Sequence, residues 1–203
     1  SPYVLAKELI ENGEIGEIFR VHAVCSGGDL KDNATHTVDL MRYILGDLPV
    51  EWVVGQIDRV GSETQYDLHS ESFGLGYFKF ENNIRGLIES GNDTAPGYHH
   101  IFCYGTDGEI ELAVPGGPAI RMRTKGTNGD WITPDLPPEI SPVQDMVAAI
   151  DEDRQHRSSG YQGLATLELL MAIYQSSRKR QRVHLPLEEP ESPLTLMIED
   201  GWV

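Results

Sequence analysis

Apolar residues in the first quarter of the chain follow helical spacing, then strand spacing, then helical spacing again. The stripe within residues 5–10 predicts a short helix that Gly13 ends. Apolar and polar side chains alternate from Ile18 to Ser26, which predicts a strand. The repeat from Asp32 to Leu45 predicts an amphipathic helix, with Gly46 placed to end it.

From Val50 to Thr124 the pattern changes to strands separated by short turns. Candidate strands cover residues 51–60, 70–80, 84–91, 100–104, 109–113 and 120–124. The turns Glu81–Asn83 and Thr106–Gly108 contain residues that tolerate left-handed backbone geometry, so hairpins are expected there. This part of the chain therefore predicts an antiparallel sheet.

The last part of the chain is predicted to be mostly helical. Ser141-Pro142-Val143-Gln144 is a capping box with proline at the first helical position, which predicts a helix to Asp151. Helical spacing from Leu164 to Ser177 predicts a longer helix, followed by a strand from Val183 to Leu187. The apolar core stripe expected on this longer helix comprises Leu164, Leu167, Leu170, Met171 and Tyr174.

These elements together predict an α+β fold in which a predominantly antiparallel, open-faced sheet carries helices on one face. Phe73, Leu75 and Tyr77 alternate along one strand face, while Phe78 and Phe80 occupy the other. Both faces of the sheet are therefore expected to be at least partly buried. Another copy of the chain would cover the open face, or a loop or the C-terminal tail would fold over it.

Composition is that of a globular domain. The 203 residues are 39% hydrophobic and 24% charged, which is sufficient to bury a core as one domain. We assign residues 1–187 to this domain and residues 188–203 to a C-terminal tail. Cys25 and Cys103 are too few for a disulfide framework.

Charge and hydropathy narrow the classes of partner. The formal charge of −16 repels nucleic acid phosphates and anionic membranes, so neither is an expected partner. The sequence contains nothing that resembles a signal peptide or a membrane-spanning apolar segment, and we expect a cytoplasmic location.

The run from Gly27 to His36 carries the most distinctive chemistry. Asp32 and His36 are four residues apart, which places both on one face of a helix with Cβ atoms roughly 6 Å apart. An imidazole can carry a proton near neutral pH, and a neighbouring carboxylate can orient it or bind a hydroxyl. In the simpler interpretation, Asp32 only caps the helix and His36 is a partly buried polar residue.

Other candidate residues have weaker support. Arg20 and His22 lie on the polar face of the first strand, opposite an apolar face that includes Phe19, and could contact a substrate. His99 and His100 are adjacent in a strand pattern and would point to opposite sides, so they are poor joint metal ligands. No metal site is expected.

Several motifs, in order, resemble one protein family. They are the opening run Ala6 to Ile18, the pattern Gly-Gly-x-Leu-x-Asp-x-x-x-His that ends at His36, the helix through Gly46, the helix Leu164–Ser177 and the closing strand Val183–Leu187. In this order they resemble the C-terminal domain of the glucose-fructose oxidoreductase, inositol dehydrogenase and MocA family.

The resemblance implies hydride transfer between NAD or NADP and a CH–OH group of a sugar, cyclitol or related polyol. His36 would be the base or proton relay, Asp32 would orient the imidazole or bind an adjacent hydroxyl, and Asp39 would support the helix or the site from behind. The resemblance also implies a homo-dimer or homo-tetramer formed through the open sheet face.

The chain departs from the family pattern in one important respect. No G-x-G-x-x-G fingerprint follows a strand, and the family's Glu-Lys-Pro lysine is missing. The expectation is therefore an excised substrate-binding half, inactive alone, whose cofactor is bound mainly by another domain. Two alternatives stay open: a non-catalytic relative that senses a sugar or nucleotide, and a nicotinamide-assisted glycosidase.

Overall fold

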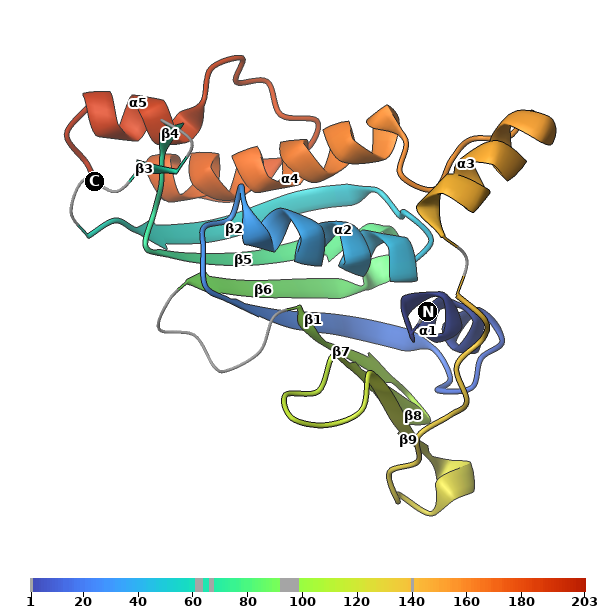
Figure 1. Cartoon of the computed structure of the whole chain (residues 1–203). Coiled ribbons are helices and arrows are strands. Elements are labelled where there is room, and N and C mark those ends of the chain that lie inside the picture. Colours follow the sequence, from blue (N-terminus) through green and yellow to red (C-terminus); the bar gives the residue numbers. More distant parts are fainter. Residues whose placement is uncertain (1, 61–63, 66–67, 92–98, 140) are drawn as a thin grey trace.

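The computed structural model describes residues 2–60, 64–65, 68–91, 99–139 and 141–203. Its centre is a twisted eight-stranded sheet (Figure 1). In spatial order the strands are β10 (Val183–His184), β2 (Val50–Asp58), β5 (Phe73–Phe80), β6 (Arg85–Gly91), β1 (Ile18–Ser26), β7 (His100–Gly105), β8 (Gly108–Leu112) and β9 (Ile120–Thr124). Neighbours are antiparallel except β1 and β6, which are parallel. Two short strands, β3 (Thr64–Gln65) and β4 (Leu68–His69), form a separate pair.

Both predicted hairpins are present. A short 3-10 turn, η1 (Glu81–Asn83), joins β5 to β6, and Asn82 and Asn83 both have positive φ. Thr106 and Asp107 join β7 to β8. A second 3-10 turn, η2 (Lys125–Thr127), follows β9.

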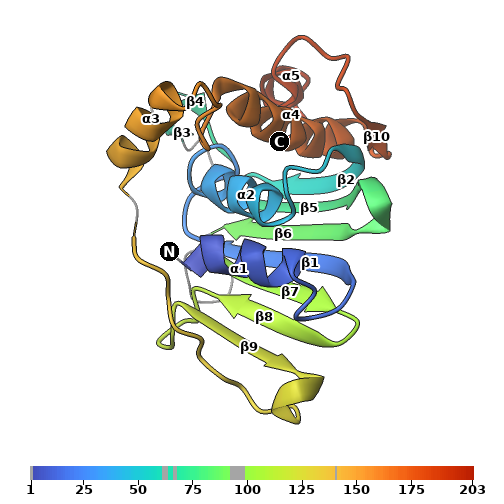
Figure 2. The same ribbon diagram turned by 90° about the vertical axis from the view of Figure 1, so that its right-hand side faces the viewer.

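Helices cover one face of the sheet, as predicted (Figures 1 and 2). They are α1 (Pro2–Glu11), α2 (Asn33–Ile44) and α4 (Gly160–Lys179), with α3 (Pro142–Asp151) at one end of the molecule and α5 (Pro193–Glu199) on the outer side of α4. The capping box at Ser141 and Gln144 is formed at the start of α3. No helix in the described part of the chain is long and apolar enough to cross a bilayer.

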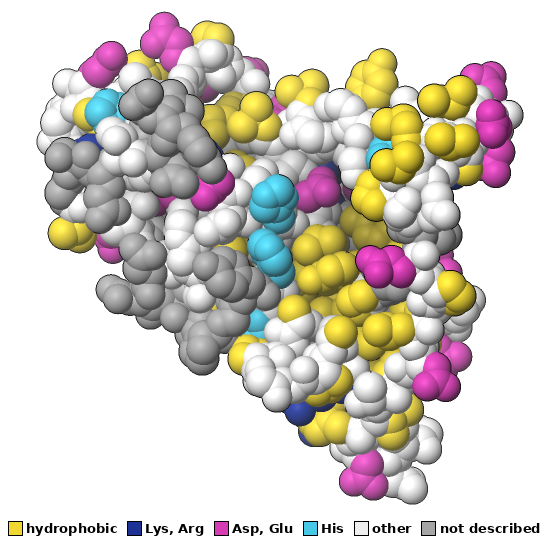
Figure 3. Space-filling model, viewed as in Figure 1, with side chains coloured by type: hydrophobic (Ala, Val, Ile, Leu, Met, Phe, Trp, Pro, Cys, Tyr) yellow, Lys and Arg dark blue, Asp and Glu magenta, His cyan; other side chains and the backbone are white. Residues whose placement is uncertain are grey.

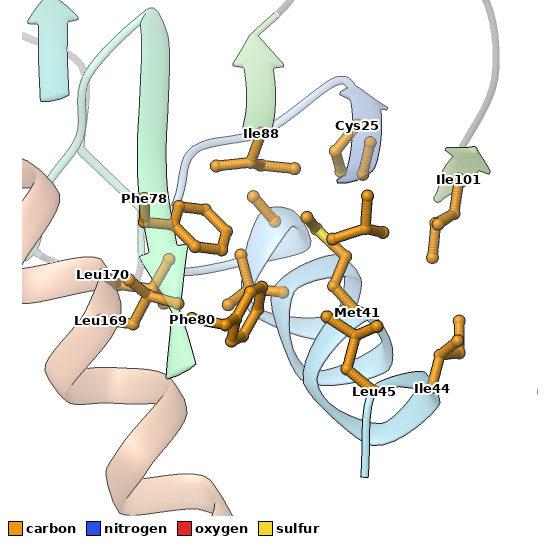
Figure 4. Close-up of a cluster of buried hydrophobic side chains, with 14 of the residues drawn as sticks. Cys25, Met41, Ile44, Leu45, Phe78, Phe80, Ile88, Ile101, Leu169 and Leu170 are labelled. Atoms are coloured by element: carbon orange, nitrogen blue, oxygen red, sulfur yellow. The ribbon is translucent and has the colours of Figure 1, made fainter. Parts of the chain in front are cut away.

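The core lies between the helices and the covered sheet face. Figure 4 shows Met41 of α2, Leu45 at the C-cap of α2, and Leu169 and Leu170 of α4 turned toward strand residues of the sheet, including Phe78. All five are nearly inaccessible to solvent. The opposite face exposes more apolar surface, with Val54 and Tyr77 44% and 38% accessible.

Phe19 was predicted to lie on the apolar face of β1, and the structure shows that it does not. The pairing of β1 with β7 is irregular between Ile18 and Arg20, which breaks the strict alternation of side chains. Phe19 is exposed, and it lines a surface cavity of about 480 Å³ together with Tyr104 and Arg123.

The second half of α4 approaches β2 and β5 very closely. Modelling a methyl group onto Gly55 would bring it to 2.6 Å from the Ile173 carbonyl oxygen, and one on Gly76 would lie 2.5 Å from Ile173 Cδ1. Ser176 and Ser177 accept hydrogen bonds from β2 backbone N–H groups at 2.9 and 3.1 Å. β10 pairs with only part of β2, and α4 accepts hydrogen bonds from two of the backbone N–H groups of β2.

The predicted apolar stripe of α4 is only half buried. Leu170 and Tyr174 are in the core, but Leu164 and Leu167 are 64% and 49% exposed. The first turns of α4 pack beside α2 through polar contacts, in which the buried Arg42 guanidinium donates to Gln162 O and Thr166 Oγ1. Helical spacing alone could not show that the apolar core ends halfway along the helix.

The tail after Leu187, to which no element had been assigned, contains α5. Leu194 and Met197 of α5 are buried in the core beside α4. Arg178 of α4 pairs with Glu189 and Asp200, each at 3.5 Å. These contacts fix the C-terminal segment on the outer side of α4.

The close approach of α4 yields a testable pair of variants. Gly76→Ala forces a methyl group against Ile173 and should lower the free energy of unfolding by about 1 to 3 kcal/mol. Gly163→Ala in the exposed first half of α4 meets no atom within 4 Å and should raise it by about 0.5 to 1 kcal/mol. Urea unfolding of both variants measures the difference, and equal stability of the two would contradict the described packing.

Candidate active site

The loop from β1 to α2 is a sharp turn built on two glycines. Gly27 and Gly28 both have a φ of +78°, a conformation that residues with a Cβ rarely adopt. Gly27 N–H donates to Gly91 O at 3.1 Å, and the Asn33 amide donates to Gly27 O at 2.9 Å. The turn is thereby attached to both β6 and the first residue of α2.

Asp32 occupies the N-cap position of α2, but its side chain makes no capping hydrogen bond. The preceding Asp29 takes that role, because its carboxylate accepts from Asp32 N–H at 2.6 Å and its carbonyl oxygen accepts from Ala34 N–H at 3.2 Å. The interpretation of Asp32 as a simple helix cap is therefore wrong. The Asp32 side chain is half buried.

His36 is exposed one turn into α2, and its ring meets that of His99. The two ring centroids are 6.1 Å apart at an interplanar angle of 86°. His99 Nδ1 is 2.6 Å from the hydroxyl of the buried Thr37, which fixes the ring. Histidine side chains gather near the middle of this face of the molecule (Figure 3).

His99 was not selected as a site residue from the sequence, which placed it within a strand. It lies just before β7 with φ +56°, a left-handed conformation. As predicted, His99 and His100 point to opposite sides, since His100 contacts Glu111 at 2.7 Å. The adjacent histidines His99 and His100 were the only feature of the local sequence that could have indicated this site residue. The contact of His99 with Thr37 depends on tertiary structure and could not be predicted.

The electrostatics of the cluster favour a neutral His99. Burial lowers the pKa of His99, and the nearby charge of His36 lowers it further. Burial raises the pKa of the Cys25 thiol, hydrogen bonding with Thr37 and the His99 backbone opposes the rise, and the charge of Asp32 adds to it, so Cys25 stays a thiol at neutral pH. His99 is therefore neutral at neutral pH and can offer a hydrogen bond beside the exposed His36.

Two buried carboxylates, neither of them predicted from the sequence, lie behind the loop. Asp29 accepts from the Ser70 hydroxyl at 2.7 Å. Glu71 accepts from Leu30 N–H at 2.6 Å and from the Tyr174 hydroxyl at 2.8 Å. Burial raises the pKa of Glu71 above its ordinary value, although these two hydrogen bonds oppose the rise.

Arg20 and His22 are not brought together with Asp32 and His36. Both lie on the open face of the sheet, where Arg20 stacks over Tyr104 and His22 lies 3.4 Å from a carboxylate oxygen of Glu89. Strand alternation explains this placement, since Cys25, on the site side, has the opposite orientation. Burial lowers the pKa of His22, and the Glu89 charge partly offsets that effect.

Asp39 joins α2 to α4. Its carboxylate accepts from Thr166 Oγ1 at 2.9 Å and lies 3.9 Å from the Arg42 guanidinium. It thus supports the helix that carries His36 without entering the His36 and His99 cluster. Within the described ranges, no three His, Cys, Asp or Glu side chains are grouped to hold a metal ion.

Comparison with known proteins identifies a family and a fold. A family model described as the oxidoreductase family, C-terminal alpha/beta domain, matches residues 7–185. No curated protein sequence matches the chain.

Solved structures with the same fold include three oxidoreductases. Aldose-aldose oxidoreductase from Caulobacter crescentus, complexed with glycerol, has a TM-score of 0.75 at 18% identity over 90% of this chain and 60% of its own. The WlbA dehydrogenase from Bordetella pertussis, in complex with NADH and UDP-GlcNAcA, has a TM-score of 0.65 at 22% identity over 93% and 61%. An Agrobacterium radiobacter oxidoreductase in complex with NAD+, L-tartaric acid and magnesium has 0.67 at 21% over 90% and 61%. The chain thus spans about 60% of the length of these structures.

The lowered pKa of His99 predicts a pH-dependent stability. Because His99 binds a proton less readily in the folded chain, its contribution is complete above its ordinary value of 6.5 and is lost as the pH falls through that value toward the lowered one. Acidification from pH 7.5 to 5.5 should therefore destabilise the wild type more than His99→Gln. Thermal unfolding measures this, with the exposed His184→Gln as the control that keeps the wild-type pH slope.

Proposed function

The chain belongs to the glucose-fructose oxidoreductase, inositol dehydrogenase and MocA family through its C-terminal α/β domain, and from this we propose that it is the substrate-binding part of a nicotinamide-dependent oxidoreductase. Its substrate would carry a CH–OH group, as in a sugar, a cyclitol or a related polyol. The single observation that carries the proposal is the exposed His36 held beside His99 and one turn after an Asp32 that does not cap its helix.

In the proposed reaction, a nicotinamide held on another domain would supply the hydride acceptor, and the part of this chain is to remove the hydroxyl proton. His36 takes that proton, since an exposed imidazole can exchange it with solvent. Asp32 orients the imidazole or binds an adjacent hydroxyl. His99, fixed by Thr37, offers a second hydrogen bond to the polyol from the same direction.

The chain's own residues do not fit a bound dinucleotide, so we place the cofactor mainly on another domain. Among the described residues, the glycine turn that leads from a strand into a helix is the one at α2, and it carries Asp29 and Asp32, whose charges repel a pyrophosphate. The apolar side chains of α3 and the first half of α4 support a docked domain. Those largely exposed are Val143, Met146, Val147, Ile150, Tyr161, Leu164 and Leu167.

We also propose that two copies of the chain associate through the open sheet face. Val54, Tyr77 and Leu87 continue across β2, β5 and β6 as an apolar row. The row extends to His22 and Phe102 on β1 and β7, whose rings stack at 5.6 Å. A second copy would bury this row, as an interface core requires.

A kinetic prediction tests the catalytic roles. In the protein that carries this chain together with its nucleotide-binding domain, His36→Ala should lower kcat by about 10² to 10⁴, the effect of losing a positioned acid-base group. Asp32→Asn should lower kcat, raise KM, or both. Nicotinamide absorbance during polyol oxidation reports the rate.

His184→Ala is the matched control, because it removes an exposed histidine far along the chain and should leave turnover unchanged. Full turnover by His36→Ala with every polyol that the wild type oxidises would remove His36 from the mechanism.

A second prediction concerns association. Light scattering at tens of micromolar protein in moderate salt should give at least a dimer, and Tyr77→Lys on the open face should convert it to a monomer. Ile150→Lys adds the same charge to the exposed apolar side of α3 and should leave the mass unchanged. A dimer that only Ile150→Lys disrupts would move the interface from the sheet to α3.

A further inference from the structure

Two buried carboxylates hold the residues that lead into α2. Asp29 and Glu71 are only 5% and 3% exposed, and each of their four oxygen atoms receives a hydrogen bond. The donors to Asp29 are Asp32 N–H and the Ser70 hydroxyl. The donors to Glu71 are Leu30 N–H and the Tyr174 hydroxyl.

These contacts connect three separate parts of the fold. Ser70 and Glu71 lie between β4 and β5, Tyr174 lies on the buried side of α4, and Asp29 and Leu30 belong to the turn after β1. We call this group of residues (Asp29, Ser70, Glu71 and Tyr174) the carboxylate clamp.

Packing reinforces the clamp from the sheet side. The Leu30 side chain lies over Gly74, where a Cβ would be 2.7 Å from it, so β5 leaves room for the turn. Lys31 donates from its ammonium group to the His69 carbonyl oxygen on the adjoining β4. The turn is thus held at three consecutive residues, 29–31, immediately before Asp32.

Holding a turn with two buried acids has a high cost in free energy. Burying a carboxylate costs several kcal/mol unless its oxygens are hydrogen-bonded, and two negative charges side by side repel each other. The clamp meets the first condition, since every oxygen has a donor, but apolar packing would hold the turn at a lower electrostatic cost. The acids add a directional contact, because a carboxylate that accepts a hydrogen bond from a backbone N–H fixes the orientation of that peptide group.

One of those N–H groups belongs to Asp32 itself. Asp32 has the unusual backbone angles φ −89° and ψ −82°, and its N–H is fixed on Asp29. This hydrogen bond fixes the backbone of the residue at the N-cap of α2, the helix that presents His36, and the Asp32 side chain makes no capping hydrogen bond.

We propose that Asp29 and Glu71 are positioning residues for the site: they hold Asp32 and His36 in the geometry that a polyol meets. This rests on the proposed function for the identity of the ligand, but the clamp itself is defined by its own contacts. Neither acid is expected to touch substrate, since both are buried behind the turn.

The test compares, for each acid, an amide variant of nearly the same side-chain shape with an alanine variant that lacks the side chain beyond Cβ. In the 203-residue chain, Asp29→Asn and Glu71→Gln retain an acceptor oxygen for the backbone N–H groups, whereas Asp29→Ala and Glu71→Ala remove it. NMR of the Asp32 carboxyl carbon and the His36 ring, with myo-inositol as the probe ligand, is the readout. Both Ala variants should shift the Asp32 and His36 signals and weaken any myo-inositol binding by about tenfold or more, and the amide variants should restore wild-type signals.

Amide signals of β8 and β9, which are remote from the clamp, show whether a variant is folded. Should an Ala variant unfold, Ser70→Ala and Tyr174→Phe remove one donor each and should produce smaller shifts at the same two residues. Unchanged Asp32 and His36 signals in folded variants that lack the clamp contacts overturn the proposal.

Failure of the proposed function looks different. A wild-type enzyme whose hydride transfer does not depend on His36 would remove the proposed reaction, while the Asp32 and His36 signals would still report whether the clamp positions them. Shifts in the Ala variants that the amide variants do not reverse would show that the negative charge, and not the hydrogen-bond geometry, matters, and would also overturn positioning.

Discussion

The contact of α4 with the middle of the sheet is the constraint on which the rest of the structure depends. Ile173 reaches β2 and β5 only because Gly55 and Gly76 carry no side chains. The next residue, Tyr174, is then buried where its hydroxyl meets Glu71, and Glu71 in turn holds the turn before α2. Tyr174 therefore links the packing of α4 on the sheet to the turn before the candidate site, in addition to the polar contacts of Asp39 and Arg42 with the first half of α4.

The two faces of the sheet carry different kinds of interaction. The covered face is apolar and close-packed, and the site lies at its edge, where β1 passes into α2. The open face combines aromatic rings with ion pairs, among them Glu111, which contacts both His100 at 2.7 Å and Arg121 at 2.5 Å. Arg121 and Arg123 also stack on Trp131. A surface of this composition has enough polar and charged groups to be stable in water, and its central row is apolar enough to bind another surface.

The sequence predicted what depends on local chemistry. The capping box at Ser141, the asparagine turn after Phe80 and the helix that presents His36 were all predicted correctly, because each is determined by neighbours in the chain. The overall fold class also followed, from the order of motifs and the strand pattern. Asp32 and His36 were found because their spacing on one helix is visible in the sequence, but whether they act on a substrate is a proposal.

Contacts between distant segments were not predictable in the same way. Asp29, Glu71 and Tyr174 look like an ordinary turn residue, loop residue and core residue until the fold brings them together. The sequence pattern placed His99 in a strand. In the structure His99 itself has a left-handed backbone conformation just before β7, and this places its ring beside His36. Leu164 and Leu170 have the same helical spacing, but only Leu170 lies where α4 covers the sheet.

The parallel pairing of β1 with β6 has a consequence for how the chain folds. Arg20 on β1 pairs with Arg85 on β6, and α2, β2 and β5 lie between these two strands in the sequence. Pairing across such a long stretch of sequence closes slowly, because the loop entropy is lost before the contacts compensate for it. During synthesis β1 leaves the ribosome before both of its partners, β6 and β7, so its two edges stay unpaired until they follow, and unpaired strand edges can associate with wrong partners.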